Sequence, residues 1–492
     1  MVEDKELKRG LSFPMAIFII VGMVIGSSIW VSPAAYLSTT GPAIFIAYLL
    51  AVIPGIFVAF IVAYVGSALP VAGGSYVITS RLTGGFGGFM TAWLIILAVG
   101  GALAYLATTF GLFIGEIFNI APQDELLFSV IIAVIVLFAF YFLNWIKIEL
   151  SGLVELIITI VGDILVMLIF IFAAIPHFNA SNFDPLFPLG LEPMLFATLT
   201  FFYSYTGFTL ILDVAGEVKK PSKNIPRSLV ISIVLLAVLY TLQALMVAGV
   251  QPYATAGDLD TVTKIILFGG ILPPEALVVI RILIAVAIAS TLHPIYMAYS
   301  RDILMAGRER LFPRVLSKVN AKHRTPRPAL TLLLIVGVAL LITFVPIITI
   351  SLNLEVGTTA TLMSVITGII VLILQIPICL AAVILPKKFP KYHERSRFKP
   401  SRRVLKIMGI LGAAFSFIFI LLLFTEPEAG FIISIIVFPY AGVGIIIYLI
   451  RKKKLEKKGI NIKELMNKLP ESVITDEGVP SKIDRLASEK DT

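Results

Sequence analysis

The stretch GMVIGSSIWVSP, residues 22–33, lies inside a long apolar run that begins near Phe13. A helix in such a run favours Leu and Ala, yet this stretch holds two glycines, adjacent serines and, at its end, Pro33. Glycine, serine and proline each weaken or end a helix. The stretch therefore predicts a helix that is interrupted in the middle of an apolar segment.

The composition indicates a membrane protein. Hydrophobic residues make up 58% of the chain against 14% that are charged, and the mean hydropathy is +1.00. A soluble domain cannot bury that much apolar surface. The single cysteine, Cys379, excludes an internal disulfide framework, and the four histidines are too scattered to predict a metal site. We expect no metal and no cofactor apart from a coupling ion.

The apolar pattern predicts an all-α polytopic protein with twelve spans, each of about 20 residues or more. The first run is too long for a signal peptide, so we expect an uncleaved span. The predicted spans are 13–37, 43–68, 86–118, 127–147, 151–176, 193–213, 227–250, 277–306, 329–349, 354–385, 404–424 and 430–450.

The distribution of charge predicts the orientation. If the N-terminus is cytoplasmic and the spans alternate, all 39 Lys and Arg residues lie in cytoplasmic segments except Lys264 and Arg281. This positive-inside pattern predicts a multi-pass protein of the cell (plasma) membrane with both termini in the cytoplasm. It also accounts for the net charge of +9 without nucleic acid. The basic clusters 387–403 and 451–458 are expected to anchor the topology and to contact anionic lipid.

A change in composition divides the chain into a transporter domain, residues 1–451, and a polar cytoplasmic tail, residues 452–492. The tail is expected to hold a short amphipathic helix or to be disordered.

A second interruption lies in the sixth span, where SYTGFT (204–209) is polar and contains a glycine. The sixth span follows the first by five, and an odd offset reverses direction. Two five-helix units would therefore be inverted relative to each other, with two further helices after them. Paired broken helices in inverted repeats indicate the midplane site of a secondary transporter. We expect unwinding at residues 22–28 and 203–207.

Unwinding a helix frees backbone N–H and C=O groups, which must face protein or a cavity because lipid cannot partner them. The N-terminus of the following half-helix suits a carboxylate. The carbonyls that end the preceding half-helix suit an ammonium group or Na⁺. A zwitterion such as an amino acid fits this pair of breaks.

Four stretches of the chain resemble the amino acid–polyamine–organocation superfamily of secondary transporters. They are GMVIGSSIWVSP (22–33), LPVAGGSYVITSRLTGGFGGF (69–89), GEVKKPSKNIPRSL (216–229) and YSRDILMAGRERLFPRVLSKVNAKHRTPRPAL (299–330). The resemblance spans roughly residues 10–450, and the four motifs together are specific although each is weak alone.

The resemblance implies ten core helices in an inverted repeat plus two more. It implies that the substrate carboxylate binds backbone amides at the first break and that the amine binds carbonyls of both breaks. The implied substrate-binding residues are Gly22, Val24, Gly26, Ser27, Ser28, Tyr203, Ser204, Tyr205, Thr206 and Gly207. The implied gate is Tyr203, and the side-chain pocket is expected near Tyr105, Phe202, Tyr205, Phe208 and Thr209.

The chain departs from the family pattern at four positions. Ser28 stands where the third break residue is usually Gly, and Thr209 where many relatives carry an acid. Gly216 replaces the first acid of a usual Glu-Glu pair. Gly162 stands where many proton-coupled relatives place a Lys on helix five, so their coupling mechanism is not carried over.

Intramembrane charges are costly and often functional. Asp163, in the middle of helix five, is a candidate for proton coupling. Alternatively, carbonyls of Gly22 and Ile25 with the hydroxyl of Ser290 or Thr291 hold Na⁺, or exchange is uncoupled. We expect a structural or gating role for Asp213 and packing for His293. Glu116 and Glu155 lie nearer span ends and are expected to reach water.

The sequence favours a permease for neutral amino acids, because the expected pocket residues are uncharged. A cationic amino acid or polyamine exchanger is the alternative, and a channel or scaffold subunit is the alternative of a different class. An enzyme is disfavoured because the chain has no H-E-x-x-H, G-x-S-x-G or P-loop motif. The expected partners are an amino acid and the bilayer, with a homodimer left open.

Overall fold

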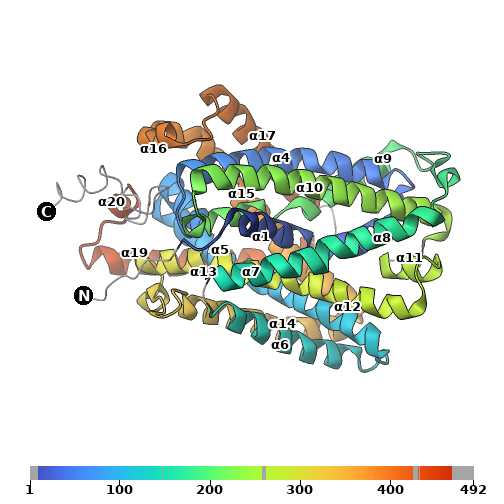
Figure 1. The fold of residues 1–492 in the computed structure, drawn as a ribbon. Helices are drawn as coiled ribbons and strands as arrows, with labels where there is room; N and C mark the ends of the chain where they lie inside the picture. Colours follow the sequence, from blue (N-terminus) through green and yellow to red (C-terminus); the bar gives the residue numbers. More distant parts are fainter. Residues whose placement is uncertain (1–8, 147, 258–261, 425–429, 432, 468–492) are drawn as a thin grey trace.

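The structure is a computed structural model that describes residues 9–146, 148–257, 262–424, 430, 431 and 433–467. Long helices lie side by side along one axis of the molecule, and short helices and loops gather at its two ends (Figure 1). In the described residues, extended segments pair only in an isolated bridge between Leu11 and Val218. The predicted all-α class is confirmed.

Most spans are single helices and four are built from consecutive pieces. The single helices are α4 (Ile44–Ala68), α5 (Gly74–Phe118), α6 (Glu125–Leu143), α10 (Pro221–Val250), α14 (Arg327–Leu352), α15 (Val356–Lys388) and α17 (Arg402–Leu423). The last span joins the π-helix η9 (Ile433–Val437) to α19 (Phe438–Glu456). Three other spans are composite. The first span, helix one, consists of α1 (Phe13–Ile25) and α2 (Ser28–Ala35), and the fifth span, helix five, consists of α7 (Ile148–Ile158), the π-helix η1 (Thr159–Leu165) and α8 (Val166–Ala174). The eighth span consists of α12 (Pro274–Ser290) and α13 (Leu292–Arg308). Short helices connect them: α3 (Leu37–Thr40), α11 (Val262–Phe268), α16 (Pro390–Arg395) and α20 (Ile462–Asn467).

Eleven helices among the described residues are long and apolar enough to cross a membrane. They correspond to eleven of the twelve predicted spans. The exception is the sixth span, which we call helix six. Its α-helical part, α9 (Leu191–Phe202), is only 12 residues long and is followed by short 3₁₀ turns. The difference arises from the break that the sequence predicts there, and the twelfth crossing stays a prediction.

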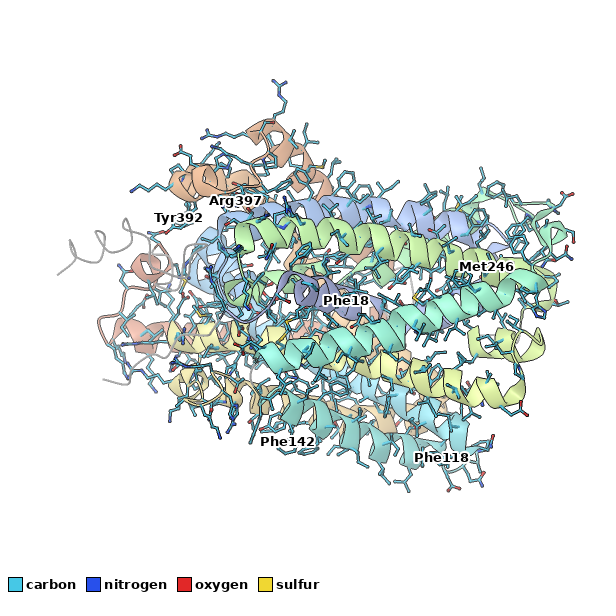
Figure 2. All side chains as sticks on the ribbon, viewed as in Figure 1. Phe18, Phe118, Phe142, Met246, Tyr392 and Arg397 are labelled. Carbon is cyan, nitrogen blue, oxygen red and sulfur yellow. The ribbon has the colours of Figure 1, made fainter. Side chains whose placement is uncertain are left out.

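Helix α5 forms the centre of the bundle, where it packs against α6, α12, α13, α14 and α15. In its most apolar window 83% of the residues are buried, against 22% in the last span. Apolar side chains at the periphery, such as Phe118 and Phe142, point outward (Figure 2) and are 68% and 52% exposed. A surface of exposed Leu, Ile and Phe side chains is what lipid requires of a spanning bundle.

Two helices differ from a regular α-helix near glycines. Helix α5 starts twelve residues before the predicted span 86–118 and bends at Gly84, whose φ of 79° and ψ of −170° are not helical. Helix five widens into η1 around Gly162, where a side-chain Cβ would lie 3.2 Å from the amide nitrogen of Ala287. Gly162 therefore allows α12 to approach closely, as small residues do between membrane helices.

One end of the molecule, where α16 and α20 lie, carries the basic segments 387–403 and 451–458, and we call it the basic end (Figure 1). There Leu11 donates its N–H to Glu217 and accepts from the N–H of Lys219, at 3.0 and 2.8 Å. The Glu217 carboxylate accepts from Nε of Arg301 at 2.7 Å and from Nη2 at 3.3 Å, and both side chains are buried. A bidentate ion pair thus ties the segment after helix six to α13.

Gly216, beside this ion pair, explains one departure from the family pattern. A Cβ at Gly216 would lie 2.8 Å from the backbone nitrogen of Ala72. The backbone before α5 therefore fills the space that an acidic side chain would need.

Two aspartates meet at the N-terminus of α5, where backbone amides lack partners within the helix. The amide of Ser75 donates to Oδ1 of Asp213 at 2.7 Å, and the amide of Tyr76 donates to Oδ1 of Asp302 at 2.8 Å. Asp213 follows helix six and Asp302 belongs to α13. The start of α5 is therefore held between these two elements by carboxylates that favour a helix N-terminus.

The beginning of the predicted tail packs on the bundle. Helix α19 runs on past residue 451 to Glu456, and α20 places buried Ile462 and Met466 beside α5. Nη1 of Arg81 donates to the sulfur of Met466 at 3.5 Å. The division at residue 451 stays a prediction, and residues 468–492 of the tail lie outside the described residues.

The ion pair at the basic end gives a stability prediction. Replacing Arg301 by Met leaves the buried Glu217 carboxylate without its cation, so we expect a loss of about 3–5 kcal/mol in the free energy of unfolding. Lys452→Met is the matched control, because Lys452 and Glu456 are 47% and 55% exposed and 3.9 Å apart. We expect this control to change stability by less than about 1 kcal/mol. The measurement is thermal unfolding of the purified protein, followed by size-exclusion fluorescence, and equal midpoints for the two variants would contradict the prediction.

Candidate functional site

Helix one breaks at two residues. Helix α1 ends at Ile25, Gly26 adopts φ 50° and ψ −147°, and α2 begins at Ser28. The expected unwinding of residues 22–28 is therefore too wide, because residues 22–25 remain helical. Gly26 has a positive φ that an L-residue side chain strains to adopt, and nothing lies within 4 Å of the position its Cβ would take.

Helix six loses its regular form over a longer stretch. Residues Tyr203–Tyr205 form a 3₁₀ turn, Thr206 and Gly207 follow as a turn, and a second 3₁₀ segment spans Phe208–Leu212. The φ of Gly207 is 113°. A Cβ at Gly207 would lie 3.3 Å from the carbonyl oxygen of Met23, so the two breaks face each other closely.

A cavity of about 90 Å³ lies at the meeting of the two breaks. Helices α1 and α2, helix six, α5, α13 and α15 all contribute to its wall. None of the lining residues carries a charged side chain. They are Met23, Val24, Ile25, Gly26, Ser27, Ser28, Ala102, Tyr105, Leu106, Thr206, Gly207, Thr291, Ile295, Tyr299, Thr367 and Val371.

Donors from neighbouring helices hold the backbone of helix one around the break. Thr291 Oγ1 donates to the carbonyl of Gly22 at 2.9 Å, and the hydroxyl of Tyr240 donates to the carbonyl of Val24 at 3.1 Å. Beyond the break, Nε2 of Gln243 donates to the carbonyl of Ile29 at 2.9 Å. These bonds satisfy carbonyls that would be costly in an apolar interior.

The structure brings six of the ten implied substrate-binding residues to the cavity, together with Tyr105 and Thr291. Val24, Gly26, Ser27, Ser28, Thr206, Gly207, Tyr105 and Thr291 line it. The hydroxyl groups of Ser27 and Tyr105 are in hydrogen-bond contact, so α5 reaches the break directly.

Other predicted residues lie behind the cavity wall. Gly22 is buried one turn before the break, and the Phe202 ring stacks on Phe419. Tyr205 donates its hydroxyl to the carbonyl of Tyr48 at 3.2 Å. Ser204, Phe208 and Thr209 are buried. The side chain of Tyr203, the expected gate, lies outside the described residues.

Sequence reasoning missed the part of the cavity wall that α13 and α15 supply. Ile295, Tyr299, Thr367 and Val371 line the cavity from these helices. No motif in the sequence distinguishes these positions from other apolar or polar positions on long helices. Their role follows only from the way the helices pack around the break.

The coupling candidates lie beside the cavity. Asp163 is completely buried on η1, and Oγ of Ser290 lies 3.3 Å from its Oδ2. Oγ of Ser290 also lies 2.6 Å from the carbonyl oxygen of Ala287, and in the described part of the chain the Oδ1 atom of Asp163 has no hydrogen-bond partner. Thr291 contacts helix one through Gly22, as described above.

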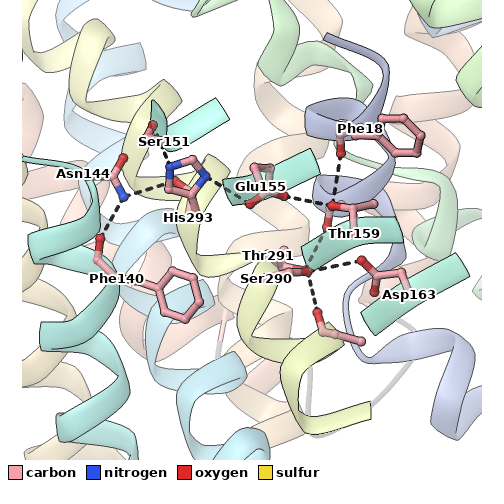
Figure 3. A network of polar contacts seen from close by, with 12 residues as sticks. Phe18, Phe140, Asn144, Ser151, Glu155, Thr159, Asp163, Ser290, Thr291 and His293 are labelled. Carbon is pink, nitrogen blue, oxygen red and sulfur yellow. Dashed lines mark hydrogen bonds and ion pairs between the residues drawn. The ribbon is translucent and has the colours of Figure 1, made fainter. Parts of the chain in front are cut away.

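A second buried polar cluster on helix five corrects an expectation. Glu155 was expected to reach water near the end of its span, but its side chain is completely buried. Its Oε2 lies 3.0 Å from Nδ1 of His293, whose Nε2 lies 3.0 Å from Oγ of Ser151 (Figure 3). The expectation was wrong because the partner of Glu155 lies on α13, far away in the sequence. By contrast, Glu116 is partly exposed beside Arg281, at 3.4 Å.

In the part of the chain that the structure describes, no three His, Cys, Asp or Glu side chains gather as metal ligands. The site therefore consists of backbone groups, hydroxyls and apolar side chains around two helix breaks. Such a site can bind a small polar molecule.

The sequence profile of the amino acid permease family matches residues 11–450, and the chain belongs to this family. The branched-chain amino acid permease BcaP of Bacillus subtilis (strain 168) is 26% identical over 339 residues, covering 66% of this chain and 72% of that protein. The methylthioribose transporter of the same organism is 25% identical, with the same coverage. Cationic amino acid transporter 5 of Arabidopsis thaliana is 27% identical over 267 residues, covering 52% of this chain and 46% of that protein. These findings confirm the resemblance to the superfamily and indicate a multi-pass membrane transporter rather than an enzyme.

The open space beside Gly26 gives a prediction about ligand binding. Gly26→Ala and the larger Gly26→Leu place a side chain into the cavity and strain the backbone by about 1–3 kcal/mol. We expect both variants to remain folded and to lose binding of radiolabelled leucine, measured by scintillation proximity. Gly442→Ala is the control, since Gly442 lies within α19 with no atom within 4 Å of its Cβ position. Wild-type binding by Gly26→Ala would show that this backbone position does not face the ligand.

Proposed function

We propose that the chain is a secondary active transporter that moves neutral amino acids across the cell membrane by alternating access. The observation that carries the proposal is the uncharged cavity between two facing helix breaks. In this proposal the twelve helices comprise two inverted five-helix repeats and two further helices, and both termini lie in the cytoplasm. Interrupted helices that surround a central cavity are the usual place for the substrate of such a transporter.

The breaks supply both halves of a zwitterion site. The substrate carboxylate binds at the N-terminus of α2, where the first amides, including that of Ser28, lack intrahelical partners. The substrate amine binds carbonyls at the end of α1 and in helix six. The carbonyl of Val24 already accepts from Tyr240, and a carbonyl oxygen has a second lone pair for an ammonium group.

The lining favours a neutral side chain, because no acidic residue faces the cavity. The relative named as a branched-chain amino acid permease supports this choice. The relative named as a cationic amino acid transporter keeps cationic amino acids or polyamines as the second candidate. The buried Asp163 lies outside the cavity wall, so a cationic side chain would need a movement of helix five to reach it.

Counterflow separates the candidates. We expect vesicles that contain purified protein and unlabelled leucine to take up radiolabelled leucine, isoleucine and valine in a saturable way, and arginine and putrescine at the rate of empty vesicles. Saturable counterflow of arginine or putrescine would favour the second candidate. A channel or scaffold subunit would give no counterflow, and that result would contradict transport by this chain alone.

Proton coupling through Asp163 is the mode of energy coupling that we propose. The carboxyl is buried and has no paired cation among the described residues, and an acid in that position within a membrane is a candidate to bind and release a proton. The alternative is Na⁺, held by carbonyls of Gly22 and Ile25 with Ser290 or Thr291. That arrangement requires the Thr291 hydroxyl to turn away from the Gly22 carbonyl that now accepts from it. Uncoupled exchange is the third possibility.

The coupling proposal predicts that an inward pH gradient without Na⁺ drives leucine accumulation in vesicles of the wild type. Asp163→Asn keeps the size of the side chain and removes the ionisable group. We therefore expect it to lose the response to the gradient. A wild type that ignores the gradient, or an Asp163→Asn variant that responds as the wild type does, would contradict the role of Asp163.

A further inference from the structure

Glu155 and His293 form a buried pair that the proposed transport cycle does not use. Glu155 lies on α7 and His293 on α13, and neither side chain is exposed. Neither residue lines the cavity. The hydrogen bonds drawn in Figure 3 connect the pair to the end of α6 through Asn144, whose Nδ2 lies 3.5 Å from the carbonyl oxygen of His293.

The hydrogen bonds of the pair remain satisfied in two charge states. An ionised carboxylate only accepts, so Nδ1 of His293 carries a hydrogen that it donates to Glu155. The hydroxyl of Ser151 can donate to Nε2 of a neutral imidazole or accept from Nε2 of an imidazolium. A proton can therefore bind at Nε2 or leave it while both ring nitrogens keep their partners.

The pair touches helix one through Glu155. A Cβ at Gly22 would lie 2.4 Å from Oε1 of Glu155 and 2.7 Å from Oγ1 of Thr159. The carboxylate thus packs directly on the backbone of α1, one turn before the break at Gly26. The single hydroxyl hydrogen of Thr159 has two acceptors, Oε1 of Glu155 at 3.3 Å and the carbonyl of Phe18 at 3.4 Å.

The charges around the pair are few. On helix five, Asp163 is the other buried acid and lies about two turns further along the chain. Helix α1 carries no titratable side chain between Phe13 and Ile25. On α13, His293 is the hydrogen-bond partner of Glu155. Asn144, directly after α6, is polar but its side chain does not titrate. The charge of Glu155 is therefore balanced by His293 alone among these groups.

We propose that the Glu155–His293 pair is a proton-binding site that controls the packing of helix one on helix five. The inference rests on the proposed function in that helix one moves during transport, and it is independent of the role of Asp163. With the proton bound, imidazolium and carboxylate balance each other, and Thr159 donates to the carbonyl of Phe18. When the proton leaves, the carboxylate draws the hydrogen of Thr159 away from Phe18, and the contact between α1 and η1 weakens.

The test is leucine counterflow in vesicles with equal pH on both sides. We expect the wild-type rate to change by about tenfold over roughly pH 5 to 8, because in this proposal a histidine binds and releases the proton. Glu155→Gln and His293→Gln each remove one member of the pair, so we expect a much smaller change of rate with pH from both. Glu116→Gln, at the partly exposed end of α5, is the matched control and is expected to follow the wild type.

A second measurement counts protons directly. Leucine binding is followed by calorimetry in two buffers that differ in enthalpy of ionisation, and the heats differ only if protons are taken up or released. We expect a difference for the wild type and for Glu116→Gln, and a smaller one for Glu155→Gln, in which Asp163 is the acid of helix five that remains. If Glu155→Gln does not fold, His293→Gln gives the same test.

The outcomes separate this inference from the proposals above. A wild-type pH profile from Glu155→Gln or His293→Gln would overturn the proton-binding site while leaving transport intact. Wild-type vesicles without counterflow of any amino acid would instead overturn the proposed function. Loss of gradient-driven accumulation in Asp163→Asn, with its pH profile of counterflow unchanged, would assign separate roles to the two acids of helix five.

Discussion

A backbone group without a hydrogen-bond partner is costly in hydrocarbon, and the break at Gly26 exposes several at once. The structure answers this with donors from other helices: Thr291 from the α12–α13 span, and Tyr240 and Gln243 from α10. Each satisfies one carbonyl of helix one. Ser28, the first residue of α2, lines the cavity at the same break. Helix α10 and the α12–α13 span therefore pack on helix one where their side chains can donate to its free carbonyls. The candidate site is the part of the break that these helices do not cover.

At the basic end, side chains likewise supply hydrogen-bond partners for free backbone groups, here at the N-terminus of a helix. We call this set of contacts the closure. The first amides of α5 take carboxylates from Asp213 and Asp302, which belong to the two elements that flank it. Gly216 lets the chain before α5 pass closely enough for the Arg301–Glu217 ion pair to form beside it. Three of the four stretches that resemble the family thus meet at this closure, while the fourth forms the break. The motifs therefore mark two places in the molecule. One is the break in helix one beside the cavity, and the other is the closure that holds the helices together at the basic end.

On helix five, the distance of a residue from the end of its span does not predict its burial. Asp163 and Glu155 lie on the same helix, and only Asp163 looks central when distance from the span ends is the measure. In the folded protein both are completely buried, because the helices that cover this face of helix five bring Ser290 and His293 against it. The π-helical turn at Gly162 adds to this by admitting α12 at close range. A histidine that seemed isolated in the sequence is the counterpart of a buried acid.

The sequence by itself determined the helical class, the position of both breaks and about half of the residues that line the cavity. Length, hydropathy, glycines and prolines act locally, so they can be read from a short window of residues. It overestimated the unwinding before Gly26, because residues 22–25 stay helical once Thr291 and Tyr240 hold their carbonyls. Only the tertiary structure decided that α13 and α15 complete the cavity and that Glu155 pairs with His293. Those contacts join residues more than a hundred positions apart, and their partners are chosen by how helices pack rather than by any local pattern.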